Sequence, residues 1–153
     1  MKPLYILVFS SLVSGMAAGQ TQPVQGAAVS VQATFVPAAD VVLADLLYLK
    51  RPVVVFADSS NDPSFVRQME LLSRDPQGLA DRDVLVITDT DPATPSALRV
   101  KLRPKGFSLV IMDKDGKTTL RKPLPWDVRE IGNAIDKFPT ALLEELERHP
   151  AGR

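Results

Sequence analysis

The sequence contains no cysteine, a single histidine and no excess of either charge. Without cysteine, thiol catalysis, disulfide exchange and cysteine-ligated metal sites are excluded. With His149 as the lone histidine, a zinc site built from several histidines is excluded as well. Basic and acidic residues number 18 each, and no long run of one sign occurs. We therefore expect neither the basic stripe of a nucleic-acid-binding protein nor the polybasic patch of a membrane-surface protein, and we expect no cofactor.

Long hydrophobic runs are also missing, apart from a short one at the N-terminus. Lys2 precedes an apolar stretch at residues 4–13, and small residues follow as far as Gly19. This order is typical of a secretory signal peptide cleaved near Ala18 or Gly19. The apolar stretch is too short to span a bilayer comfortably, although an uncleaved anchor is the alternative. We assign residues 1–19 to a signal peptide and expect a secreted or periplasmic mature protein with no membrane span after cleavage.

Residues 20–38 carry no charge and form either a leader or an edge strand. Val29, Val31, Ala33 and Phe35 alternate with polar residues, which is the periodicity of a strand. An edge strand here also offers a route for self-association as a structural subunit.

The rest of the chain alternates strand and helix patterns through one domain, residues 39–148, before a polar tail at residues 149–153. Unbroken apolar runs at residues 53–57 and 84–88 predict strands buried on both faces of a sheet. Residues 107–112 and 118–122 predict a hairpin whose tight turn uses Gly116 at positive φ.

Proline and cap residues delimit the predicted helices between these strands. Asp62 and Pro63 begin one helix, Thr94 and Pro95 begin another, and Pro125 begins a third. Helical spacing of apolar residues also predicts short helices over residues 40–49 and around residues 142–146. The resulting β-α-β-α-β-β-α order, with a helix-linked parallel pair and an antiparallel hairpin, is an α/β arrangement of the thioredoxin-like type.

Three segments resemble a known bacterial family of exported small proteins, the domain of unknown function 4174. They read LLYLKRPVVVFA at residues 46–57, DRDVLVI at residues 81–87 and GFSLVIMDKDG at residues 106–116. The family is similar to the peroxiredoxin-like domain of sushi-repeat-containing extracellular proteins. The resemblance covers residues 43–139, and its motifs are a Lys-Arg-Pro before a strand and a Lys-Asp-Gly hairpin. It implies a thioredoxin-like fold without the thiol pair and no established reaction.

The loop after the first predicted central strand is the place where thioredoxin-like proteins hold their reactive cysteines. Here it contains Asp58, Ser59, Ser60, Asn61 and Asp62. Unpaired backbone N–H groups at a helix N-terminus favour anions, so this loop is a candidate ligand or partner surface. The alternative is structural, with Asp62 capping the helix and Asp58 capping the turn.

Two basic residues are predicted to face this loop. Arg103 and Lys105 flank Pro104 just before the third strand, which is antiparallel to the first and so begins beside the loop. They predict either a salt bridge to Asp58 or Asp62, worth roughly 0–1 kcal/mol if exposed, or an anion-binding notch.

Four aspartates follow the ends of two parallel strands. Asp58 and Asp62 follow one strand, and Asp89 and Asp91 follow its neighbour, so their ends lie side by side. Converging carboxylates would suit Ca²⁺ or Mg²⁺ or acid–base catalysis, although the spacing matches no calcium loop.

Two classes of function therefore stay open. The first is an exported, redox-inactive binding module for an envelope protein or a small ligand, acting through the loop with Arg103 and Lys105 or through the exposed face of the last helices. The second is a non-thiol enzyme or divalent-cation binder that uses the four aspartates.

Overall fold

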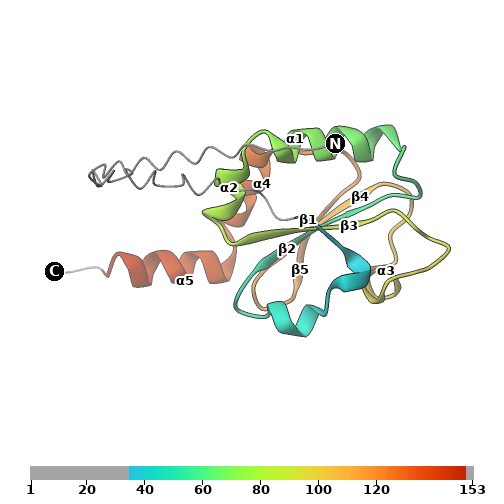
Figure 1. Ribbon diagram of the computed structural model, residues 1–153. Helices are drawn as coiled ribbons and strands as arrows, with labels where there is room; N and C mark the ends of the chain where they lie inside the picture. Colours follow the sequence, from blue (N-terminus) through green and yellow to red (C-terminus); the bar gives the residue numbers. More distant parts are fainter. Residues whose placement is uncertain (1–34, 151–153) are drawn as a thin grey trace, which may run out of the picture.

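The computed structural model describes residues 35–150, which form a five-stranded mixed sheet with helices on both faces (Figure 1). The spatial order of the strands is β1-β3-β2-β4-β5. Their bounds are β1 (Phe35–Pro37), β2 (Arg51–Phe56), β3 (Val84–Asp89), β4 (Ser108–Met112) and β5 (Thr118–Lys122). β3 is parallel to both β1 and β2, whereas β4 is antiparallel to β2 and β5. This α/β arrangement confirms the predicted helix-linked parallel pair and hairpin.

The first strand belongs to the segment predicted as a leader or an edge strand. Phe35–Pro37 pairs in parallel with β3 at the edge of the sheet. The alternating residues 29–34 and the predicted signal peptide at residues 1–19 lie outside the described residues.

Strand β2 lies at the centre of the sheet, and all six of its residues are buried. Pro52 is tolerated in this strand because of the direction in which its nitrogen points. The Arg51 N–H donates to the Asp83 carbonyl oxygen on the β3 side at 2.9 Å, so the Pro52 nitrogen faces β4. Pairing with β4 begins only at Val53, so no ladder hydrogen bond is lost.

The helices are α1 (Pro63–Ser73), α2 (Pro76–Ala80), α3 (Ala97–Leu102), α4 (Val128–Ile135) and α5 (Pro139–Arg148), with 3₁₀ turns η1 (Ala38–Asp40) and η2 (Leu43–Leu46). The start of α1 after Asp62 is confirmed. α2 was not predicted, although Asp75 and Pro76 repeat the cap-and-proline signal of α1.

Three predicted helix starts or spans are wrong. The helix over residues 40–49 is replaced by η1 and η2, because neither turn has a side-chain cap and Tyr48 takes a left-handed φ of 60°. Helix α3 is capped by Ser96 rather than Thr94, since the Ser96 hydroxyl accepts from the Arg99 N–H. Helix α4 begins after Asp127, which forms a capping box with Glu130, rather than at Pro125.

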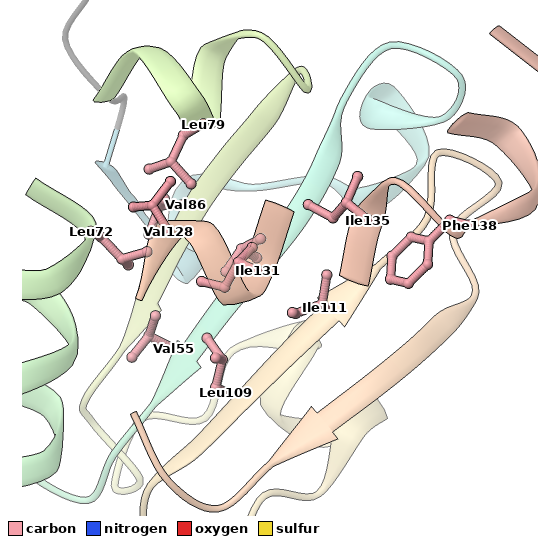
Figure 2. Packing of buried hydrophobic residues seen from close by; sticks show 11 residues of the cluster. Val55, Leu72, Leu79, Val86, Leu109, Ile111, Val128, Ile131, Ile135 and Phe138 are labelled. Atoms are coloured by element: carbon pink, nitrogen blue, oxygen red, sulfur yellow. The ribbon is translucent and has the colours of Figure 1, made fainter. Parts of the chain in front are cut away.

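Two hydrophobic clusters cover the two faces of the sheet. One joins α1, α2 and α4 to Val53 and Val55 of β2, and the other joins α3, η1 and η2 to Val54 and Phe56. Figure 2 shows the first cluster, in which side chains of α4 lie over strands β2 and β4. The alternation of inward and outward side chains along β2 therefore builds both halves of the core.

A buried charge network at the start of β2 fixes α5 to the sheet. Arg51 is only 2% exposed, and its guanidinium donates to Thr140 Oγ1 at 2.9 Å and to Glu144 Oε2 at 3.1 Å. It also donates to the Arg82 carbonyl oxygen at 3.0 Å, and its Nε lies 3.4 Å from Asp113 Oδ1. The network connects β2 to α5, although Arg51 and Glu144 are 93 residues apart in the sequence.

The β4–β5 hairpin supplies the other half of this anchor. Asp113 accepts a hydrogen bond from the Thr140 backbone N–H at 3.2 Å and another from the Thr140 hydroxyl. It thereby replaces the missing side-chain cap at Phe138. Lys114 Nζ bridges Asp83 at 2.7 Å and Glu144 at 2.8 Å. The Lys-Arg-Pro and Lys-Asp-Gly motifs of the sequence thus meet at one structural site.

We expect Arg51→Met to lower the free energy of unfolding by about 3–5 kcal/mol, because it leaves the buried Asp113 without its charge partner. Lys50→Met is the matched control, since Lys50 is half-exposed and 3.9 Å from Asp83; it should change stability by about 0.5 kcal/mol or less. Urea denaturation measures both. Equal effects of the two substitutions would show that Arg51 does not anchor the fold.

Candidate functional site

The predicted site lies where β2 and β3 end and α1 begins. Most residues of the 58–62 loop form hydrogen bonds or ion pairs within the loop, with the start of α1 or with Arg99. Asp62 Oδ1 accepts from the N–H groups of Ser64 at 2.8 Å and Phe65 at 3.1 Å, which confirms its role as the cap of α1. Ser59 Oγ accepts from the Asn61 N–H at 3.1 Å. The N–H groups expected to attract an anion at this helix end are therefore already paired by Asp62.

An arginine that the sequence patterns did not single out lies beneath this loop. Arg99 of α3 is 8% exposed, and its Nε lies 2.8 Å from Asp89 Oδ1. Its Nη2 donates to the carbonyl oxygens of Ala57 at 2.7 Å and Asp89 at 3.0 Å. The guanidinium also lies 5.5 Å from the centre of the Phe56 ring. Arg99 therefore binds the ends of β2 and β3 to each other.

Asp58 is the loop residue that reaches this arginine. Its carboxylate is 63% exposed and lies 3.6 Å from Arg99 Nη1. The predicted salt bridge from Arg103 or Lys105 to Asp58 or Asp62 is wrong, because Arg99 projects from α3 directly under the loop and takes that place. Asp58 nevertheless lies near the segment that follows Arg103 and Lys105, because a Cβ added to Gly106 would be 4.0 Å from Asp58 Oδ2.

The four aspartates predicted as a cation or catalytic site do not gather around one point: Asp58 and Asp89 share Arg99, whereas Asp62 and Asp91 bind backbone N–H groups. Asp89 is 7% exposed and is held by Arg99 and by the Ser96 hydroxyl at 2.6 Å. Asp91 accepts from the N–H groups of Ala93 and Thr94 in its own turn. Over residues 35–150, no three histidine, aspartate or glutamate side chains lie close enough to hold a metal ion. The expectation that these carboxylates converge is therefore wrong.

The acidity of Asp91 also differs from that of a general acid. Hydrogen bonds from Thr94, and then from the Ala93 N–H, hold the pKa of Asp91 below its ordinary value. A carboxyl group that donates a proton near neutral pH needs a raised pKa. Asp91 is therefore a charged turn residue.

Arg103 and Lys105 lie on a separate cavity, here called the basic pocket. Its volume is about 410 Å³, and it is lined by Arg103, Lys105, Phe107, Ser108, Arg121 and Pro123. Arg121 comes from β5, was not predicted, and donates to the Leu102 carbonyl oxygen at 2.7 Å. Arg103 ends α3 in the left-handed conformation, with φ 47°, which turns the chain into the pocket wall.

The three cations of the basic pocket lack acidic partners within the described chain. Over residues 35–150, the ion pairs closer than 4.0 Å involve other basic residues, among them Arg51, Arg82, Arg99 and Lys114. Arg103, Lys105 and Arg121 thus gather positive charge around a concavity that also has an apolar part, Phe107 and Pro123. Such a surface suits a ligand that carries an anionic group.

The strand order and pairing give an α/β domain that resembles the thioredoxin fold, and the polar loop after its central strand caps helix α1. The chain belongs to the family described as Domain of unknown function (DUF4174), which matches residues 42–144. This confirms the resemblance seen in the sequence. No thiol redox activity is possible in this member, because it contains no cysteine.

Two solved structures from Plasmodium yoelii are similar in fold. Prx1a, in a form modified at its N-terminus, is 18% identical, with a TM-score of 0.48 over 74% of this chain and 84% of that chain. Thioredoxin peroxidase I is 15% identical, with a TM-score of 0.46 over 74% of this chain and 83% of that chain. No curated protein matches the sequence. Among the helices of residues 35–150, none is long and apolar enough to cross a membrane.

We expect Asp62→Ala to cost about 1 kcal/mol of stability, because two N–H groups of α1 lose their acceptor. Asp58→Ala is the control from the same loop, and it should cost less because its ion pair is exposed and 3.6 Å long. Thermal or urea unfolding distinguishes them. An Asp62→Ala protein as stable as the parent would contradict the capping role.

Proposed function

We propose that this protein is an exported, redox-inactive binding module that recognises an anionic group of an envelope protein or small ligand at the basic pocket. The observation that carries this proposal is the contrast between two neighbouring sites. At the ends of β2 and β3, Asp58 and Asp89 both pair with Arg99, so the charge of this arginine is neutralised within the protein. In the basic pocket, three cations face a cavity with no carboxylate partner from residues 35–150.

The composition of the basic pocket supports an anion with an apolar portion. Arginine offers a planar fork of N–H donors that matches carboxylates and phosphates, and both Arg103 and Arg121 line the cavity. Ser108 adds a buried hydroxyl, and Phe107 provides an apolar wall. The volume of about 410 Å³ lies in the range of small-ligand sites, and it also suits an acidic side chain of a partner protein.

The non-thiol enzyme or divalent-cation binder receives less support from the geometry. Its four aspartates are a helix cap, a turn residue and two partners of Arg99. A ligand there would have to displace these contacts, whereas the basic pocket offers its cations directly.

A labelled hexaglutamate peptide is the probe that tests the basic pocket. We expect the double variant Arg103→Glu/Lys105→Glu to bind it at least tenfold more weakly than the parent, as measured by fluorescence anisotropy. The matched control is Arg129→Glu/Lys137→Glu, which makes the same change of net charge at two exposed positions. Arg129 lies in α4, and Lys137 lies just after it. Equal losses in both variants would mean that only net charge matters and would overturn the proposal.

Export is tested separately by the mass of the chain recovered from a bacterial periplasm. We expect the recovered protein to begin near Gly19 or Gln20, because the apolar stretch at residues 4–13 directs cleavage. Val8→Arg should keep the full-length chain in the cytosol by interrupting that stretch, whereas Gln25→Arg should not. Full-length parent protein confined to the cytosol would contradict export.

A further inference from the structure

Helix α5 turns its polar side toward the body of the protein and its apolar side toward solvent. Thr140 and Glu144, one turn apart, bind Arg51. Leu142, Leu143 and Leu146 lie on the other side of the helix and are 51%, 59% and 62% exposed. These three residues are here called the leucine stripe. Figure 1 shows α5 extending away from the end of the sheet, with no other described element over it.

This orientation is the reverse of that of an ordinary surface helix, which buries its apolar face. Rolling α5 by half a turn would bring the leucine stripe against the protein, and the hydrophobic effect favours that. The same roll would remove Glu144 from Lys114 and Arg51, and Nη2 of the buried Arg51 guanidinium would lose both of its acceptors, Glu144 and Thr140. The charge network therefore holds the leucine stripe outward.

The anchor is charged at neutral pH. Burial acts to raise the pKa of Glu144, but hydrogen bonds from Lys114 and Arg51 outweigh it, and the pKa lies below its ordinary value. The pKa of Asp83, the other partner of Lys114, is lowered in the same way against the effect of burial. Both carboxylates are therefore ionised at neutral pH, and the ion pairs that orient α5 are present.

Carboxylates outnumber cations around the leucine stripe. Glu145 and Glu147 adjoin it on α5, and both are exposed; Glu145 lies 3.1 Å from Arg148 and 3.4 Å from His149. A cavity of about 500 Å³ beside the helix is lined by four carboxylates and two cations: Asp81, Asp83, Glu144, Glu147, Lys114 and Arg148. A second cavity of about 450 Å³ includes Leu142 itself and is lined by four carboxylates and three cations: Asp81, Asp136, Glu144, Glu145, Arg51, Arg82 and Arg148. An occupant must therefore combine apolar and basic side chains.

We infer that the leucine stripe is a docking surface for an amphipathic, basic segment of a partner protein. Leucine side chains of that segment would cover Leu142, Leu143 and Leu146. Its lysines or arginines would pair with Glu147 and would share Glu145 with Arg148. A second copy of α5 fits poorly, because pairing two stripes would place these glutamates against their own counterparts. The leucine stripe lies near the start of β2. The basic pocket lies near the other end of this strand, because its lining residue Ser108 pairs with Phe56, the last residue of β2. The two surfaces are therefore separate.

The test uses the mature chain and two labelled peptides of matched pattern, LKKLLKLLKKLLKL and its counterpart with glutamate at every lysine. We expect the lysine peptide to bind at least tenfold more tightly than the glutamate peptide in fluorescence anisotropy. Leu142→Ser/Leu143→Ser/Leu146→Ser should weaken binding at least tenfold. The matched control is Val66→Ser/Val100→Ser/Leu124→Ser, at apolar residues that are 44%, 61% and 67% exposed, and it should change binding less than twofold.

Charge and assembly are examined with the same peptides. Glu145→Gln/Glu147→Gln keeps the leucines and should weaken binding of the lysine peptide at least threefold, even if the serine variant does not fold. Arg103→Glu/Lys105→Glu should leave that binding unchanged, which separates this surface from the basic pocket. No binding of the lysine peptide, or equal binding of both peptides, overturns the inference. So does a dimer in sedimentation that the leucine substitutions abolish, because the occupant is then a second copy.

Discussion

The fold depends on a guanidinium that is buried where three distant parts of the chain meet. Arg51 begins the central strand, Asp113 begins the hairpin turn and Glu144 lies in the last helix. A charge removed from water must be paired, and a single hydrogen-bond acceptor would leave most of the five donors of an arginine unsatisfied. Nη1 and Nη2 donate to Arg82, Thr140 and Glu144, whereas the buried Nε has no hydrogen-bond acceptor among residues 35–150 and faces Asp113 at 3.4 Å. Helix α5 takes its position and its orientation from these contacts.

The opposite end of the central strand uses the same device. Arg99 is buried against Asp89 and two backbone carbonyl oxygens, and it joins the ends of β2 and β3 to each other. Each end of β2 therefore has an arginine whose neutralisation is internal. The two surfaces proposed for recognition, the basic pocket and the leucine stripe, lie outside these internally paired strand ends.

The sequence predicted those features that arise from local patterns. The apolar runs of β2 and β3 and the Asp62–Pro63 start of α1 were correctly placed, because burial on both faces and helix capping act over a few residues. The buried arginines could not be predicted, since Arg51 and Arg99 look like surface residues until their distant partners are known. The same holds for Arg121, which enters the basic pocket through strand pairing. Local competition explains the error at α3, where Thr94 and Ser96 are both suitable caps.

The contact between Arg51 and Glu144 joins residues 93 positions apart. A ribosome delivers the central strand before it delivers α5, so the guanidinium remains without Glu144 until α5 has been made. Closing so long a loop is entropically costly and slow compared with forming local structure. The charge network around Arg51 is thus incomplete in the nascent chain until α5 has been synthesised and has docked.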